Sequence, residues 1–460
     1  MKSNSLTNKK TNPKPQPHNR CPMKIVLNPI RPALCNNSNS NSNTIQDFHV
    51  LVRLQSEHQE GFKRTPLNLS LVIDRSGSMQ GSKLVEAKRC VVDLIKRMNP
   101  EDHVGVVQYD DQVDTVVPLS TVDQVSNVIE SLVRGIRPNG FTDLHAGWLR
   151  GGEMLAPSAG RDATCHVILL SDGQTNRGNK NPQRICEQVA ALAEAGVTTT
   201  TVGLGEDFNE ELMTAMAQAG QGRSHYGERA IDLAETFDAE IGLLSQLQWR
   251  NVEMCIVNGS DQMALLNSYE RAGNAWRMPS IAMGSECWAL VRIPMQTAIS
   301  LQQIHGSALS ISVQAVNANG QTQTFEAALP TLPIVLPAQY ESEQQHELVE
   351  RRMNEMQASH IQMQMRDAAL NGDWLEAERL FAQLEILGRN EPWVAASIAF
   401  TRQLMRERDE RRMSKEMLYK SRKMEQRLSS TDEVMFSLDA DYVAPAFLRR
   451  KSTEGRRTEI

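Results

Sequence analysis

The sequence lacks the features that mark several large classes of protein. Its 460 residues contain no apolar run near the roughly 18 residues that a membrane-spanning helix needs. The seven cysteines lie far apart and never form a C-x-x-C pair, which is typical of reduced thiols and not of a disulfide framework or a zinc site. No apolar segment follows the basic N-terminus, so a secretory signal is also missing. We therefore expect a cytosolic protein without a membrane span.

Charge and motifs argue against binding to nucleic acid or nucleotides. The formal net charge is -6, so the chain has no overall attraction for polyanions. Neither a P-loop nor a G-x-G-x-x-G motif opens a helix. With 40% hydrophobic and 23% charged residues, most of the chain is expected to fold, as two or three structured units with tails.

The N-terminal segment has an unusual composition. Residues 1–46 contain no Asp or Glu and include NNSNSNSN at 36–43. Such a segment cannot bury enough apolar surface to offset its chain entropy, so residues 1–46 are predicted to be mostly disordered, apart from a short strand at KIVL, 24–27. The next run, FHVLVRL, alternates apolar and polar residues. It predicts a half-buried strand over residues 47–55 that needs a partner elsewhere.

Short β-rich runs alternate with helical stretches between residues 66 and 247. Strands are predicted at 67–73, 103–109, 113–119, 165–171 and 197–205, with helices near 84–95, 122–133, 144–155, 182–195, 210–219 and 231–247. This alternation implies crossover connections, and therefore a mainly parallel sheet with helices on both faces. The predicted fold class is α/β, a doubly wound Rossmann-like sheet.

The helical rhythm stops after Trp249. Four runs of period two, at 251–257, 287–295, 308–316 and 322–329, are separated by Gly, Asn and Ser turns. They predict a small β-sandwich over 250–337, which the strand at 47–55 completes, so the α/β domain is inserted in the sandwich.

A helical region is predicted to follow, at 341–428. It contains almost no Gly or Pro, and Gly372 and the pair Glu391-Pro392 divide it into three expected helices. Asp373 is a plausible N-cap and Gly388 a plausible C-cap.

Oxygen-bearing side chains follow three strands of the α/β domain, in the segments DRSGS, NGFTDL and SDGQTN. In a doubly wound sheet, ligands bind outside the carboxyl ends of the strands where the strand order reverses, so these loops are expected to converge. An all-oxygen set suits a hard cation, Mg²⁺ first, with Mn²⁺ or Ca²⁺ as alternatives. The predicted metal ligands are Asp74, Ser76, Ser78, Thr142 and Asp172, with Asp143 in reserve.

The charge of this set has a consequence for binding. Two carboxylates neutralise one divalent ion, and hydroxyls fill other coordination positions without quenching its Lewis acidity. An open position would then attract a carboxylate from outside. The sequence therefore predicts a protein partner that presents an Asp or Glu.

The same residues resemble the metal-ion-dependent adhesion site of von Willebrand factor type A domains. D-x-S-x-S at the end of a buried strand, a later Thr in a Gly-containing loop and SDG at a further strand end occur in the family's order, over roughly residues 66–247. IDRSGSMxGxKL and SDGxxNxG are especially similar to bacterial intracellular members and to the calcium-activated-chloride-channel-like group. The resemblance implies a binding domain without catalysis, in which the Ser and Thr hydroxyls bind the metal directly and one or both aspartates act through water. Phe141 departs from the family pattern, in which Gly commonly precedes the threonine.

Two other interpretations stay open. Asp74 could be the nucleophile of a Mg²⁺-dependent phosphohydrolase, although that chemistry needs a second acid two residues later, where this chain has Ser76. Alternatively, each polar residue taken singly is explained as a helix cap, which leaves a structural scaffold with a non-functional metal site. Among the neighbouring polar residues, His145 is read as a rim or helix-start residue, and Asp110 and Asp111 as turn residues.

The C-terminal segment, residues 429–460, is predicted to be a flexible tail. Within residues 437–450, DYVAPAFLRR resembles the C-terminal recognition peptide of the bacterial tubulin-like division protein. A short peptide on a flexible end suits transient binding in a partner groove, although chance is the simpler explanation for so short a match. Taken together, the sequence predicts a cytosolic scaffold or adaptor for metal-dependent protein interaction, and not an enzyme.

Overall fold

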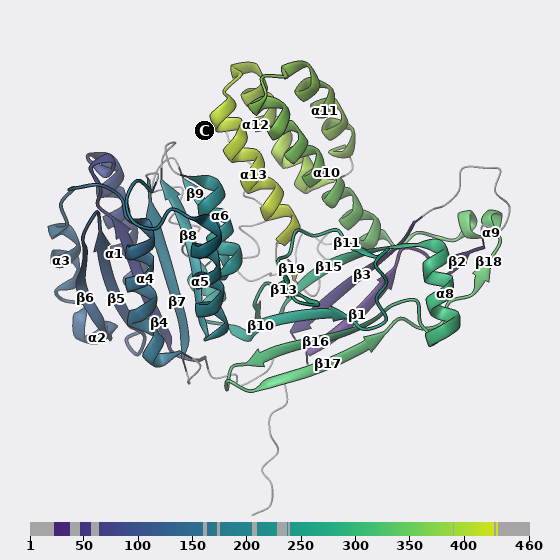
Figure 1. The fold of residues 1–460 in the computed structure, drawn as a ribbon, viewed down its shortest axis with the longest axis horizontal. Helices are drawn as coiled ribbons and strands as arrows, with labels where there is room; N and C mark the ends of the chain where they lie inside the picture. The colour runs from purple at the N-terminus through teal and green to yellow at the C-terminus, as the bar shows by residue number, and fades with distance from the viewer. Residues whose placement is uncertain are drawn as a thin grey trace, which may run out of the picture.

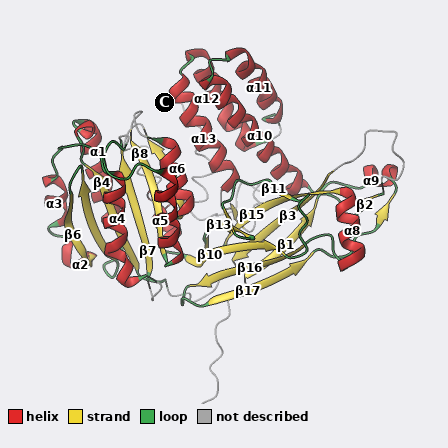
Figure 2. Cartoon of the chain, viewed as in Figure 1, coloured by secondary structure: helices red, strands yellow, loops and turns green. Residues whose placement is uncertain are grey.

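The chain forms an α/β domain, two stacked antiparallel sheets and a group of C-terminal helices, as Figures 1 and 2 show. The computed structural model describes residues 23–36, 47–56, 64–159, 163–172, 175–204, 209–227, 237, 240–389, 391–426 and 429–430. The predicted fold class is confirmed: a doubly wound sheet is inserted in a β-sandwich, and helices follow.

Six strands form the sheet of the α/β domain: β4 (Leu67–Asp74), β5 (His103–Tyr109), β6 (Val113–Thr121), β7 (Thr164–Ser171), β8 (Val197–Leu204) and β9 (Gln221–Gly227). Their order across the sheet is β6-β5-β4-β7-β8-β9, and all neighbours are parallel except β5 and β6. From β4 the chain first adds β5 and β6 on one side and later returns to β7 on the other. The strand order therefore reverses between β4 and β7, where Ile73 pairs with Leu170.

Helices cover both faces of this sheet. Residues 240–244 and α1 (Ser82–Ile95) pack on one face, and α4 (Leu144–Leu155), α5 (Pro182–Glu194) and α6 (Glu210–Ala219) on the other. β4 is buried on both sides, because Leu71 and Ile73 point into the first core while Val72 points into the second. Two short helices, α2 (Val122–Val125) and α3 (Ile129–Gly135), lie between β6 and α4.

Two glycines let α4 approach the sheet closely. A Cβ atom at Gly147 would lie 2.4 Å from the ring of Tyr109, and one at Gly151 would lie 2.4 Å from Val72. Both distances are far below van der Waals contact, so a larger residue would push the helix away from the sheet. Because α4 follows the Thr142 loop directly, its seating also sets the position of that loop.

The sandwich consists of two antiparallel sheets. One contains β1 (Met23–Pro29), β3 (Asp47–Ser56), β15 (Ser285–Pro294), β11 (Ala264–Leu265) and β19 (Ser429–Ser430). The other contains β12 (Arg271–Ala272), β13 (Ala275–Met278), β10 (Leu247–Ile256), β14 (Ile281–Ala282), β16 (Ser310–Asn317) and β17 (Thr322–Ala328). β3 pairs with both β1 and β15, so segments before and after the α/β domain share one sheet.

The remaining short elements lie at the end of the sandwich. β2 (Leu34–Cys35) pairs in parallel with β18 (Ile334–Val335), and α8 (Met295–His305) and α9 (Pro337–Ser342) lie beside them.

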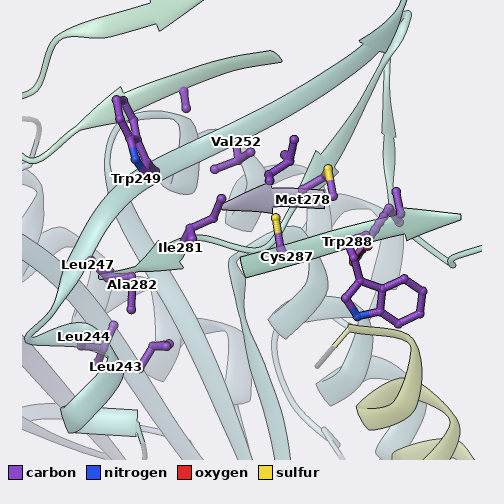
Figure 3. Packing of buried hydrophobic residues seen from close by; sticks show 14 of the residues in the cluster. Leu243, Leu244, Leu247, Trp249, Val252, Met278, Ile281, Ala282, Cys287 and Trp288 are labelled. Atoms are coloured by element: carbon purple, nitrogen blue, oxygen red, sulfur yellow. Dashed lines mark hydrogen bonds between the residues drawn. The ribbon is translucent and has the colours of Figure 1, made fainter. Parts of the chain in front are cut away.

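A continuous apolar core joins the α/β domain to the sandwich. Figure 3 shows this core running from Leu243 and Leu244 to Trp249 of β10. The ring of Trp249 packs edge to face on that of Phe325, with ring centroids 5.2 Å apart. Trp288 of β15 lies in the same core and is covered by the guanidinium of Arg352, 4.5 Å from its ring centroid. The two domains are therefore packed against each other.

The C-terminal region contains α10 (Glu347–Leu370), α11 (Trp374–Leu387), α12 (Pro392–Glu407) and α13 (Glu410–Gln426). These helices contact both other parts of the protein. Arg366 pairs with Glu211 of α6 at 2.6 Å, and the amide of Ser268 donates a 3.1 Å hydrogen bond to Glu425. Asp373 caps α11 by accepting from the amide of Glu376 at 3.0 Å, and Gly388 stands at the C-cap of that helix, both as predicted.

Several sequence predictions need correction. The short strand predicted at 24–27 is present as β1, but residues 23–36 as a whole are ordered, because β1 pairs along its full length with β3; residues 1–22 and 37–46 lie outside the described residues. The helix expected over 122–133 is broken into α2 and α3, and the break falls at Ser126 and Asn127, which are poor helix formers. The helical region has four long helices instead of three, and β9 and α8 were not predicted. The tail motif at 437–450 lies outside the described residues.

No helix in the described part of the chain is both long enough and apolar enough to cross a membrane.

Candidate metal centre

The DRSGS and NGFTDL loops are tied together at the carboxyl edge of the sheet. The amide of Gly77 donates to the carbonyl of Gly140 at 3.2 Å, and the amide of Asn139 donates to the carbonyl of Arg75 at 2.8 Å. Gly140 has a left-handed φ of 62°, and a Cβ there would lie 2.1 Å from the carboxylate of Asp111. The contact between these loops therefore depends on backbone that only glycine adopts readily.

Thr142 ties the second loop to the third. Its amide donates to the side-chain oxygen of Asn176 at 2.8 Å, and its carbonyl accepts from the amides of Asn176 and Arg177 at 3.2 and 3.1 Å. Thr142 is 2% exposed. The threonine predicted as a ligand is thus held in place by hydrogen bonds of its main chain. Its side-chain hydroxyl takes no part in these hydrogen bonds.

Four of the five predicted ligands form a chain of hydrogen bonds. The amide of Ser76 donates to Asp74 Oδ1 at 2.8 Å, the hydroxyls of Ser76 and Ser78 lie 3.1 Å apart, and Ser78 Oγ donates to Asp172 Oδ1 at 2.9 Å. Both aspartates and Ser76 are buried, whereas Ser78 is exposed. Residues from the ends of β4 and β7 are therefore within direct contact of one another, with Ser78 on the solvent side.

The aspartate at the end of β4 carries a charge in an unfavourable place. Burial raises the pKa of Asp74 to about 6, the negative charge of Asp172 adds to the rise, and hydrogen bonds from Ser76 and from Ser171, at 2.8 Å, act in the opposite direction. Tyr109, which is paired with Asp74 on the adjacent strand β5, is fully buried, and its pKa is raised by burial and by the charge of Asp74. Two carboxylates close together in a buried place would be stabilised by a cation.

Lys83 provides part of the compensating charge. Its ammonium lies 2.7 Å from Asp172 Oδ2, and its side chain is 30% exposed while that of Asp172 is fully buried. Lys83 is in the first turn of α1, directly after the DRSGS loop. One carboxylate of the pair therefore already has a positive partner supplied by the chain itself.

Asp110 is a turn residue, as predicted, because its Oδ1 accepts from the amide of Gln112 at 2.6 Å, and it has a second, positioning role that was not predicted. It is fully buried at the end of β5, where its Oδ2 forms an ion pair with Arg75 Nε at 3.0 Å and accepts a hydrogen bond from the side-chain amide of Asn139 at 3.1 Å. Its carbonyl accepts from the amide of Asp143 at 2.8 Å. Asp110 therefore joins both loops. The sequence feature that could have indicated this role is its place directly after a predicted strand.

Other polar residues near the site have different partners. Asp143, the reserve ligand, caps α4 by accepting from the amide of Ala146 at 3.0 Å. His145 is at the start of α4, in agreement with the prediction of a helix-start residue. Its Nε2 lies 2.5 Å from the side-chain oxygen of Gln188 on α5.

The donors fit a hard divalent cation. Two buried carboxylates and three hydroxyls come from three loops held together at one sheet edge, without nitrogen or sulfur donors. In the part of the chain that is described, no three His, Cys, Asp or Glu side chains are grouped to hold a metal ion. A metal centre at this edge would therefore have to use the hydroxyls.

Known proteins are similar to this chain in sequence. The family model of the von Willebrand factor type A domain matches residues 68–239. An uncharacterized protein of Synechocystis sp. is 27% identical over 194 residues, which are 42% of this chain and 45% of that one. Human inter-alpha-trypsin inhibitor heavy chain H3 is 28% identical over 183 residues, 38% of this chain and 21% of that one. The matched region thus spans less than half the length of either relative.

Solved structures share the wider fold. A von Willebrand factor type A structure from Catenulispora acidiphila aligns with a TM-score of 0.61 at 16% identity, covering 84% of this chain and 90% of that chain. The ArnB paralog VWA2 from Sulfolobus acidocaldarius aligns with a TM-score of 0.54 at 16% identity, covering 88% and 98%. Both alignments extend well beyond the α/β domain. Type A domains are commonly metal-dependent protein-interaction modules, and the α/β domain of this chain, with the loops described above, is a von Willebrand factor type A domain.

Proposed function

We propose that this protein is an interaction module that holds a divalent cation, Mg²⁺ in the first place, and presents it to a carboxylate of a partner protein. The proposed ligands are Asp74, Ser76, Ser78, Thr142 and Asp172. The observation that carries the proposal is the hydrogen-bond chain from Asp74 through both serines to Asp172, which joins two strand ends at the point where the strand order reverses.

The partners of each oxygen support separate roles for the ligands. Asp74 is engaged by the amide of Ser76 and the hydroxyl of Ser171, an arrangement that fits a carboxylate acting through water and through its charge. Ser78 is the exposed member of the chain, so it lies where a partner would approach. When bound, the cation would supply a Lewis-acidic position for one more oxygen ligand.

The rest of the chain fits a scaffold around this site. The C-terminal helices contact both the type A domain and the sandwich, through Arg366 to Glu211 and Glu425 to Ser268. A phosphohydrolase is the weaker proposal, because Ser76 stands where a second acid is needed. A cytosolic location stays a prediction, based on the scattered thiols.

The proposal is tested by capturing partners from the native cell on the full-length protein, with Mg²⁺ or with EDTA. Asp74→Ala should lose the captured proteins, and Asp74→Asn, which keeps the shape of the side chain, should lose them too. Asp123→Ala, which changes an exposed acid of the same domain, is the matched control and should keep them. Partners that stay bound in EDTA and to both Asp74 variants would contradict the proposal.

A further inference from the structure

We propose that Phe141 is a second contact for the partner, so that the site selects an acidic residue with a large apolar side chain two positions away. The inference rests on the metal-dependent function proposed above and adds the chemistry of the partner segment. The supporting observation is the exposed ring of Phe141, directly before the buried Thr142.

Phe141 is exposed although the proposed ligand that follows it is buried. Its side chain is 52% exposed, and among the aromatic residues whose exposure the structure describes it is the only exposed one. It directly precedes Thr142, which is 2% exposed. An aromatic ring left in water next to a polar site is typical of binding surfaces.

The chain cannot easily withdraw this ring. On one side, Gly140 accepts a hydrogen bond from the amide of Gly77, and on the other side Thr142 is tied to Asn176 by hydrogen bonds in both directions. The segment on which Phe141 stands is therefore fixed to the first and third loops. A partner would meet a preorganised surface, which lowers the entropy cost of binding.

Arg177 fixes the ring and sets the charge around it. Its guanidinium lies 4.7 Å from the centroid of the Phe141 ring, within the range of a cation–π contact, and its amide is bonded to the carbonyl of Thr142. Arg177 is exposed, so it places a positive charge directly beside the ring, whereas Lys83 is paired with Asp172. The charge of Arg177 complements an acidic partner segment that passes over the ring.

Geometry then limits where the apolar partner residue can be. Phe141 and the proposed ligand Thr142 are adjacent, so their Cα atoms are about 3.8 Å apart. In an extended segment, side chains two residues apart lie on the same side about 7 Å apart. A carboxylate at the ion would therefore leave the side chain two residues away within reach of the ring of Phe141.

The test uses two synthetic peptides, Gly-Gly-Glu-Gly-Phe-Gly and Gly-Gly-Glu-Gly-Gly-Gly, titrated by NMR into the full-length protein with Mg²⁺. The Phe peptide should bind about five- to tenfold more tightly to the wild type. Phe141→Ala should remove this preference without changing the affinity for the Gly peptide or for Mg²⁺. Leu132→Ala, at another exposed apolar residue of the domain, should keep the preference.

The outcomes separate this inference from the function on which it rests. Equal binding of the two peptides to the wild type, a preference that survives Phe141→Ala, or no binding of either peptide would overturn the role of Phe141. Binding that is the same with EDTA as with Mg²⁺ would instead reject the metal-dependent function. Arg177→Gln should weaken the preference for the Phe peptide, because it removes the contact that holds the ring.

Discussion

Ser78 Oγ donates a 2.9 Å hydrogen bond to Asp172 Oδ1, although 94 positions separate the two residues in the sequence. This contact joins the loop after β4 to the end of β7, at the place where the sheet reverses its strand order. The hydroxyl is exposed and the carboxylate is buried, so the pair connects the solvent side of the site to its interior.

Replacing this serine should affect metal binding more than stability. Ser78→Ala removes an exposed hydroxyl, and Asp172 keeps its ion pair with Lys83, so we expect the free energy of unfolding to change by less than about 1 kcal/mol. The affinity for Mg²⁺ should fall by about tenfold or more, because a proposed ligand is lost. Isothermal calorimetry measures the affinity, and Ser82→Ala, also at an exposed serine, serves as the control. Unchanged affinity in Ser78→Ala would count against the ligand set.

Asp74→Asn should separate stability from metal binding. The folded pKa of Asp74 is raised to about 6 by burial, so its ionisation costs folding free energy as the pH rises from about 4 to 6 and above. The uncharged amide avoids this cost, and the metal-free variant should be more stable than the wild type at pH 7 by up to about 3 kcal/mol. Chemical denaturation in EDTA measures the difference. A metal-free variant less stable than the wild type would show that the charge of Asp74 is well compensated.

Lys83→Met should strengthen metal binding. The ammonium of Lys83 lies 2.7 Å from Asp172 Oδ2, so it repels a cation bound nearby and competes for the same carboxylate. We expect the affinity for Mg²⁺ to rise about three- to tenfold, while the metal-free protein loses about 1–3 kcal/mol because a buried carboxylate loses its partner. Lys96→Met, at an exposed lysine, is the control. A weaker affinity for Mg²⁺ would mean that Lys83 supports the site.

The α/β domain should be sensitive to acid through a residue far from the metal centre. Burial lowers the pKa of His166 to about 4, against the nearby charge of Glu240, while His225 and Arg223 act in the same direction as burial. Its neutral ring is held by Thr198, 2.6 Å from Nδ1, beside a cavity of about 50 Å³.

Because the folded pKa lies below the unfolded value of about 6.5, the stability from neutral His166 is present above that pH and is lost as the pH falls towards 4. The loss should amount to about 3 kcal/mol at most. His166→Gln should therefore make the denaturation midpoint less dependent on pH between about 6.5 and 4, whereas His305→Gln, at an exposed histidine, should not. Identical pH profiles for the wild type and His166→Gln would refute this assignment.

The sheet and the convergence of the three loops could be predicted from the sequence for a physical reason. Buried parallel strands such as β4 and β7 are short apolar runs, and parallel strands bring their carboxyl ends to one edge, so Asp74 and Asp172 had to lie near each other. The N-cap at Asp373 was predictable in the same way, because capping depends on neighbouring residues alone.

The missed features depend on tertiary partners. β9 has the polar sequence QGRSHYG and is an edge strand held by β8, so no alternation marks it. The turn role of Asp110 was predictable, but its positioning role depends on Arg75 and Asn139, which reach it only in the folded chain. The short strand predicted at 24–27 is present but extends over 23–29, because its pairing with β3 orders residues whose surrounding composition is polar.

The most direct test of the central claim is a calorimetric titration of the full-length, metal-free protein with Mg²⁺, repeated with Asp74→Asn and Asp123→Asn. The account predicts one bound ion per chain for the wild type and for Asp123→Asn, and no measurable binding for Asp74→Asn. Equal binding by all three proteins, or no binding by any, would contradict it.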